Sequence, residues 1–285
     1  MQGSSSTASG ASGPIGGWKR VLAILLIGAL GGFAAGQFAA GISALRGFFP
    51  FGLLQDTGSG LARRLASRKG LEPNGEHPDR REQFEMFVRP VEVVMIGDSI
   101  TEAGMWEDMF PGIAIANRGI GADRTDDVML RMPPILELRA RKAFVMLGIN
   151  DLSADRGVDT VFADYSAILS ALRAQGVEVV VQSTLQCNLE LRRRCAAQLP
   201  LIEGLNSRLE ALAASDGLVF VDLNAVLTAP GEGLRRQFTR DGVHLNGAGY
   251  RRWADTIRPM ILKVAAEAVD SEVSGQSGQP AVDVR

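Results

Sequence analysis

Histidine and cysteine are scarce in this chain of 285 residues, which contains only two of each. A zinc site built from clustered cysteine and histidine ligands is therefore excluded, and very few imidazoles are available for catalysis. A surplus of basic residues is lacking too, since 30 lysines and arginines stand against 32 acidic residues and leave a formal net charge of -2. This balance gives no sign of nucleic acid as a partner, and neutral or weakly charged substrates fit it better.

The serine-hydrolase motif Gly-x-Ser-x-Gly is also absent from the chain. Its absence argues against the α/β-hydrolase fold, in which this motif forms a sharp turn around the nucleophile. Apolar residues, by contrast, make up 46% of the sequence, which at this length is ample for the core of a folded enzyme.

The amino-terminal part of the sequence indicates a membrane anchor. Residues 1–17 are rich in serine and glycine and are predicted to be disordered, whereas residues 18–45 form the predicted transmembrane anchor. No charged residue lies between Val21 and Leu45, and a helix of that length, rising about 1.5 Å per residue, would exceed the roughly 30 Å of membrane hydrocarbon. A Lys-Arg pair just before this run favours a cytoplasmic amino terminus and an exported catalytic domain, periplasmic or extracellular.

Two further interpretations of this segment stay open. A cleaved secretory signal with its cleavage site at Ala39-Ala40-Gly41 would give a secreted enzyme instead of an anchored one. The apolar run is longer than the ~7 to 15 residues of such a signal, so an uncleaved anchor is favoured. Gly28, Gly32 and Gly36 recur at every fourth position and would allow two such helices to dimerise, although glycine is common in membrane helices generally.

The sequence after the anchor divides into a linker, a folded domain and a tail. Residues 46–85 contain a polar stretch with proline and glycine and are predicted to be a linker, residues 86–269 form the predicted catalytic domain, and residues 270–285 are predicted to be disordered. Short β-branched runs predict strands at residues 91–96, 113–117, 143–147, 177–183 and 218–222. Helical patterns lie at residues 123–132, 159–175, 200–215 and 248–268. This alternation predicts an α/β fold, with a central parallel sheet covered by helices on both faces.

Polar clusters follow the predicted strands at their carboxyl ends, where open sheets of this kind bind their ligands. The clusters are Gly97-Asp98-Ser99, the segment from Asn117 to Asp123, Gly148-Ile149-Asn150-Asp151, and the segment from Asp241 to Asn246. Because the carboxyl ends of parallel strands meet at one edge of a sheet, we expect the four clusters to converge there.

Taken in this order, the four clusters resemble the signature blocks of the SGNH/GDSL hydrolase family, over about residues 91–264. Residues 119–123 and 241–250 are most similar to the acetylhydrolase-like branch of that family, which acts on short acyl groups. The resemblance implies a three-layer, flavodoxin-like α/β fold and a serine esterase that needs no metal and no cofactor.

The chemistry of the residues points independently to a catalytic triad. A serine hydroxyl such as that of Ser99 is a weak nucleophile until a base takes its proton, and His244 is the candidate base. The other histidine, His77, lies in the predicted linker and is interpreted as a solvated structural residue. Asp241 precedes His244 by three positions, and a tight turn through Gly242 would bring its carboxylate to Nδ1 and leave Nε2 for the serine proton.

The backbone around Ser99 is expected to begin a helix whose N–H groups favour a developing anion, with Asp98 as a structural residue of the preceding turn. In the family that this sequence resembles, the position of Asn150 completes an oxyanion hole with backbone N–H groups from the serine and the second block, here Ser99 and Ala122. Ala122 replaces the usual glycine, which puts in doubt the room beside the acyl group and any backbone that needs positive φ. Gly121 is the alternative donor.

The predicted reaction is hydrolysis of a short-chain ester, with acetyl groups on cell-envelope carbohydrate as one substrate class. Lysophospholipase and thioesterase activities are alternatives that a membrane tether also allows. An alternative outside the enzymes is a silent domain that binds acyl groups or glycans, and an intact triad argues against it.

Other residues of these blocks have structural interpretations. Cys187 and Cys195 lie in a polar loop after the fourth strand and are predicted to form a disulfide if the domain is exported, two unpaired thiols being the alternative. Asp123, Arg124 and Asp151 are predicted to cap helices or form ion pairs and not to act as catalysts.

Overall fold

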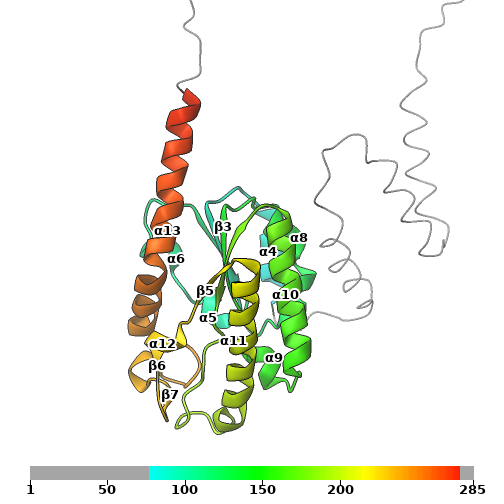
Figure 1. Cartoon of the computed structure of the whole chain (residues 1–285), viewed down its shortest axis with the longest axis vertical. Helices are drawn as coiled ribbons and strands as arrows, with labels where there is room; N and C mark the ends of the chain where they lie inside the picture. Colours follow the sequence, from blue (N-terminus) through cyan, green and yellow to red (C-terminus); the bar gives the residue numbers. More distant parts are fainter. Residues whose placement is uncertain (1–76, 277–285) are drawn as a thin grey trace, which may run out of the picture. The chain divides into compact units, whose positions relative to one another are not determined.

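The computed structural model describes residues 77–276 (Figure 1). The predicted disordered amino terminus, the transmembrane anchor or cleaved signal, the glycine stripe and most of the linker lie outside these residues. Within residues 77–276, no helix is both long and apolar enough to cross a membrane.

The centre of the domain is a parallel sheet in the order β2-β1-β3-β4-β5, which is the strand order of flavodoxin-like folds. Its strands are β1 (Val93–Gly97), β2 (Ile115–Gly119), β3 (Lys142–Met146), β4 (Glu178–Gln182) and β5 (Val219–Val221). All five lie where the sequence predicts strands, with ends shifted by one or two residues. β1 and β3 are buried along their whole length, as expected of central strands covered on both faces.

Helices cover both faces of the sheet, as predicted (Figure 1). The longest are α10 (Val158–Ala174) and α11 (Cys195–Asp216) on one face and α13 (Gly247–Gln276) on the other. The shorter helices are α4 (Pro78–Met86), α5 (Ser99–Glu102), α6 (Trp106–Met109), α7 (Thr125–Leu130), α8 (Met132–Leu136), α9 (Ile149–Ser153), α12 (Asn224–Leu227) and the 3-10 helix η1 (Arg236–Phe238). A small antiparallel pair, β6 (Thr228–Ala229) and β7 (Gly233–Leu234), lies between β5 and η1.

Helix α13 packs on the sheet through an apolar stripe. Trp253, Ile257, Ile261 and Val264 are fully or almost fully buried and recur at helical spacing along one side. The Trp253 ring meets the Trp106 ring edge to face at 4.8 Å between centroids, and its indole N–H donates to a side-chain oxygen in β4. These contacts hold the start of α13 beside the elements that follow β1.

Three predicted boundaries need correction. The predicted linker ends too late, because its last residues form α4, whose Arg81 reaches the domain and pairs with Asp123. The predicted disordered tail begins too early, since α13 continues to Gln276. The single helix predicted over residues 123–132 is two helices, α7 and α8, because Pro133 has no N–H for the hydrogen bond of a continuous helix and instead occupies the first turn of α8.

Candidate active site

Ser99 occupies the first position of helix α5, immediately after β1. The carboxylate of Asp98 accepts a hydrogen bond of 3.0 Å from the N–H of Ile100 and so caps this short helix. Gly97, Asp98 and Ser99 therefore form a strand–turn–helix junction at the carboxyl edge of the sheet. The junction places the Ser99 hydroxyl at the partly exposed start of a helix, with Asp98 buried beneath it in the structural role expected from the sequence.

His244 and Asp241 lie together on a tight loop before α13. One carboxylate oxygen of Asp241 accepts the N–H groups of Val243 and His244, each at 2.9 Å. The other oxygen lies 2.6 Å from His244 Nδ1. Gly242 has φ +87°, a left-handed conformation that glycine adopts without strain, so the predicted turn through this residue is present. Thr239 fastens the loop, because its hydroxyl accepts the N–H of Gly242 and donates to the carbonyl of His244.

Tertiary packing brings this loop to the nucleophile junction. Ser99 Oγ lies 2.9 Å from Nε2 of His244, and Asp241 holds the opposite nitrogen of the same ring. The carboxylate on Nδ1 fixes the tautomer that leaves Nε2 able to accept the serine proton. The three residues named from the sequence therefore form one hydrogen-bonded line, with the geometry needed to activate a serine hydroxyl.

The Asp241 carboxylate is held in its ionised form. Burial opposes ionisation, but hydrogen bonds from the His244 ring and from the N–H groups of Val243 and His244 together outweigh it and lower the pKa of Asp241 well below its ordinary value. A permanent negative charge at this position favours the imidazolium that forms when His244 accepts a proton.

The second block reaches the site through the end of β2. A Cβ on Gly119 would lie 2.2 Å from the backbone nitrogen of Glu102, so only glycine allows β2 to pass this close to α5. The Asn117 amide donates to the carbonyls of Thr101, Glu102 and Gly104 and thereby binds the carboxyl end of α5. Asn117 belongs to the second cluster, but the sequence predicts no role for it. An asparagine at the end of a strand carries no local signal for hydrogen bonds to a helix end elsewhere in the fold.

Ala122 has φ +59°, in the left-handed region that alanine adopts with difficulty. From the sequence we questioned whether alanine suits a position that needs positive φ, and the backbone of Ala122 does have a positive φ. The third block lies directly beside this turn, since Nδ2 of Asn150 donates a hydrogen bond of 3.0 Å to the carbonyl of Asp123. A primary amide carries two N–H donors, so one remains for a ligand. Gly121, the alternative donor, belongs to the same turn.

Buried charges surround the second and third blocks and form ion pairs, as predicted. Asp123 pairs with Arg131 at 2.7 Å, and Arg124 pairs with acidic residues of its own helix. Asp151 accepts hydrogen bonds from the N–H and hydroxyl of Thr125 and pairs with Arg156. Burial raises the pKa of Asp151 to about 6, although the hydrogen bonds from Thr125 and the charge of Arg156 act to lower it. These carboxylates stabilise the blocks that carry Ala122 and Asn150.

A buried carboxyl also lies under the nucleophile. Burial raises the pKa of Asp98 to about 7, although the hydrogen bond from Ile100 and the nearby His244 act in the opposite direction. The charges of Asp151 and Asp123 add to the increase. Among residues 77–276, no group of three or more His, Cys, Asp or Glu side chains is arranged so that it could hold a metal ion.

His77 lies closer to the site than its place in the sequence suggests. It is exposed at the start of α4, as expected of a solvated residue, yet a Cβ on Gly121 would lie 3.0 Å from its Nε2. The packing of α4 against the second block produces this approach, which no local sequence signal indicates.

Cys187 and Cys195 form a disulfide, the first of the two alternatives considered from the sequence. The loop that they close supports the triad loop, because the N–H of Asn188 donates to the carbonyl of Gly242 at 2.8 Å. The Asn188 side chain also donates to the carbonyl of Leu234 at 2.7 Å. The loop closed by the disulfide therefore supports the turn that carries Asp241 and His244.

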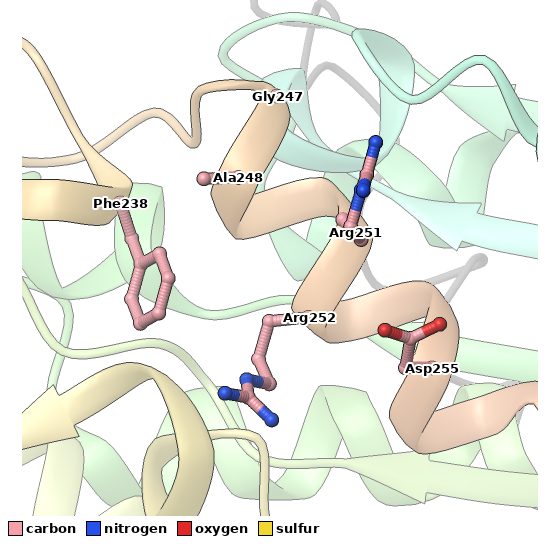
Figure 2. Close-up of a pocket in the computed structure, with 6 residues that line it drawn as sticks. All are labelled: Phe238, Gly247, Ala248, Arg251, Arg252 and Asp255. Carbon is pink, nitrogen blue, oxygen red and sulfur yellow. The ribbon is translucent and has the colours of Figure 1, made fainter.

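Open cavities lie on the His244 side of the site. A cavity of about 370 Å³ is lined by Arg240, Asp241, His244, Leu245, Asn246 and Gly247. A larger one of about 520 Å³ lies between η1 and the first turns of α13, and none of the triad residues lines it. Figure 2 shows Phe238 and Arg252 on one side of α13, with Arg251 leaving the helix on the other. The cavity that contains His244 is therefore the better candidate for substrate, although it is the smaller of the two.

A parallel α/β sheet with serine, histidine and carboxylate in one line at its carboxyl edge defines the class of serine-type acyl hydrolases. Comparison with family models gives the family within that class. The GDSL-like lipase/acylhydrolase family matches residues 95–252, and the chain belongs to this family of ester hydrolases.

Solved structures agree with this fold. A GDSL-like lipase from Bacteroides thetaiotaomicron has 25% sequence identity and a TM-score of 0.59, and the match covers 66% of this chain and 98% of that one. An acetyl xylan esterase has 24% identity and a TM-score of 0.51 over 59% of this chain and 98% of its own. A variant of a Geobacillus acetyl-xylooligosaccharide esterase has 16% identity and a TM-score of 0.51, and the match covers 70% of this chain and 99% of that one. A search of curated proteins gave no match.

Proposed function

We propose that the protein is a serine esterase that removes short acyl groups, acetyl above all, through a covalent intermediate on Ser99. Membership of the acylhydrolase family supports the class of reaction. The observation that carries the mechanism is the line from Ser99 Oγ to His244 Nε2, at 2.9 Å, and from His244 Nδ1 to Asp241, at 2.6 Å.

The proposed reaction has two steps, acylation of Ser99 and hydrolysis of the acyl-enzyme. In the first, Ser99 Oγ attacks the acyl carbon and its proton passes to Nε2 of His244. The tetrahedral intermediate expels the alcohol, which takes the proton from His244, and the acyl group stays on Ser99. In the second step His244 takes a proton from water, the hydroxide attacks the acyl carbon, and Ser99 leaves with the proton and releases the acid.

The negative oxygen of each tetrahedral intermediate needs hydrogen-bond donors. We assign this role to the N–H groups of Ser99 and Ala122 and to Nδ2 of Asn150. The hydrogen bond from Asn150 to the carbonyl of Asp123 supports the assignment, because it places the amide beside the turn that carries Ala122. Gly121 is the alternative donor.

The acyl group in this proposal is short. A methyl group at position 122, where the related family usually has glycine, reduces the space beside the acyl carbon. The alcohol is a carbohydrate of the cell envelope in this proposal, and the fold accommodates carbohydrate esters, since two proteins that share it are esterases for acetylated xylan or xylooligosaccharides.

Residues 18–45 anchor the catalytic domain on the exported side of a membrane in this proposal, with Gly28, Gly32 and Gly36 as a dimer contact. The disulfide between Cys187 and Cys195 supports export, because disulfides persist in oxidising compartments. Treatment of spheroplasts, whose outer barrier has been removed, with an impermeant protease tests it: digestion of the catalytic domain is expected, and full protection would contradict export.

Hydrolysis of p-nitrophenyl esters tests the enzymatic proposal. We expect a burst of p-nitrophenol stoichiometric with enzyme from the acetate ester, an acetyl group on Ser99 in the intact protein by mass spectrometry, and faster turnover of acetate or butyrate than of dodecanoate. Faster turnover of dodecanoate would favour a lysophospholipase. Absence of any turnover from folded protein would favour a silent binding domain.

Two histidine variants complete this test. His244→Ala is expected to reduce turnover by at least about 1,000-fold with an unchanged circular dichroism spectrum. His77→Ala, the matched control, is expected to retain activity within about threefold. Equal losses from the two variants would contradict the assignment of the base.

A further inference from the structure

Helix α4 precedes β1 and lies outside residues 95–252, the part of the chain that the family shares. Its side chains divide into two faces. Arg80, Arg81 and Phe84 are partly buried and recur at helical spacing toward the domain, whereas Glu82 and Glu85 are exposed. The inward face of this helix lies against the second block.

Arg81 contacts the buried carboxylate of the second block. Its guanidinium lies 3.2 Å from Oδ1 of Asp123, while Nε of Arg131 lies 2.7 Å from Oδ2. Arg131 also donates to the carbonyl of Gly97, the last residue of the strand that leads to Ser99. Because Asp123 is almost fully buried, its negative charge depends on these two cations. Arg81 thus completes a chain of contacts from α4 to the nucleophile junction.

Arg80 makes a second bridge to the site. Its Nε lies 3.0 Å from a carboxylate oxygen of Glu102, the last residue of α5, and 3.4 Å from the carbonyl of Gly119. Glu102 and Gly119 belong to α5 and β2, which approach each other closely beside Ser99. Arg80 therefore joins the end of the nucleophile helix to the start of the second block.

Phe84 lies among the guanidinium groups. Its ring centroid is 4.4 Å from the guanidinium carbon of Arg118, 5.4 Å from that of Arg80 and 6.0 Å from that of Arg131. An aromatic face attracts cations, so one ring here stabilises three like charges that repel one another. Of these three arginines Arg131 pairs with Asp123, so Phe84 helps to hold one of the two cations that Asp123 requires.

These contacts end on the turn that carries the proposed oxyanion donors. Ala122 has φ +59°, and a strained residue of this kind persists only where its surroundings hold it. Its neighbour Asp123 binds α4 through its carboxylate and Asn150 through its carbonyl. We infer that α4 is a positioning element for the oxyanion hole, in which Arg81 acts through Asp123 to set the relative placement of Ala122 and Asn150. This inference rests on the proposed function.

Kinetics of full-length variants on p-nitrophenyl acetate test the inference. Arg81→Gln is expected to lower kcat by about 10- to 100-fold with KM within about twofold, since a displaced oxyanion donor weakens the transition state and not the ground state. Arg81→Lys, which keeps the charge, is expected to recover part of the loss. Glu85→Gln on the exposed face and Arg89→Gln in an exposed ion pair are matched controls, expected to keep kcat within about twofold.

A double-mutant cycle separates positioning from general destabilisation. If Arg81 acts through the oxyanion donors, the double variant Arg81→Gln/Asn150→Ala should have a kcat at most about threefold below that of Asn150→Ala alone. An equal fold-loss in both backgrounds, or a folded Arg81→Gln with normal kcat, would overturn the inference. Phe84→Leu serves the same cycle if Arg81→Gln does not fold, with the same expected and contradicting results. Full activity of Ser99→Ala would instead contradict the proposed function itself.

Discussion

The hydroxyl of Tyr250 donates a hydrogen bond of 2.7 Å to the carbonyl of Ile100, and so joins α13 to the helix that begins at Ser99. The bond is buried and links two blocks that are far apart in the sequence. His244 lies just before α13 and Ser99 at the start of α5, so this contact joins the two segments that carry the proposed catalytic side chains.

Tyr250→Phe is expected to reduce the free energy of unfolding by about 1 kcal/mol, because it leaves the buried carbonyl of Ile100 without this donor. Turnover of p-nitrophenyl acetate is expected to fall several-fold as the Ser99–His244 distance becomes less well defined. Urea denaturation and steady-state kinetics provide the measurements. Unchanged turnover in a clearly destabilised protein would show that the bond supports only the fold.

Asn150→Ala tests the side-chain donor of the proposed oxyanion hole. The substitution removes a hydrogen bond made to the transition state and should lower kcat about 100- to 1,000-fold with little change in KM. The lost bond to the carbonyl of Asp123 is a further cost, so a folding control by thermal melting accompanies the kinetics. Near-normal kcat would exclude Asn150 from the oxyanion hole.

Ala122→Gly tests the strained residue of the second block. Glycine adopts φ +59° without the clash of a Cβ, so we expect the free energy of unfolding to rise by about 1 kcal/mol while the backbone donor is kept. Activity toward acetate should persist, and activity toward longer acyl groups should increase. A variant as inactive as Ser99→Ala would point to Gly121 as the donor.

Asp98→Asn tests the buried carboxyl under the nucleophile. Burial raises the pKa of Asp98 to about 7 in the folded protein, from the value 3.8 of an exposed group. Between these values the folded state binds more protons than the unfolded state, so the contribution of Asp98 to stability is lost as the pH rises from about 4 to about 7, by at most about 1.4 kcal/mol per pH unit.

The variant has no such titration. The difference in unfolding free energy, Asp98→Asn minus wild type, should therefore increase between pH 5 and pH 7 and change little above pH 8. Denaturant titrations at several pH values measure it. A difference that is constant across this range would show that Asp98 titrates as an exposed group.

The double variant Cys187→Ser/Cys195→Ser tests whether the disulfide loop supports the turn that carries Asp241 and His244. Closing a loop of this length stabilises by about 2.5 kcal/mol on the chain-entropy model, so unfolding free energy should fall by about that amount. Turnover should fall several-fold because Asn188 then holds Gly242 less firmly. Titration of free thiols in unreduced native protein is the control, and two thiols per chain would contradict the disulfide.

Much of the site follows from the sequence because it depends on local signals. β1 and β3 are apolar runs with polar residues directly after them, and a parallel sheet brings such ends to one edge whatever the details of its packing. Asp241 and His244 are three positions apart with glycine between them, so their contact is a property of one turn. Ser99, Asp241 and His244 could therefore be named before any coordinates.

Tertiary structure alone decided the contacts that hold this site together. The carboxylate of Asp123 meets Arg81 across 42 positions in the chain, and neither residue carries a local pattern that identifies the other. The linker prediction failed at α4 for the same reason. The polar residues of α4 are typical of a solvated segment, yet Arg81 pairs with the buried carboxylates of Asp123 and Asp127. Charge pairing of this kind depends on where the chain returns in space, which periodicity and composition do not encode.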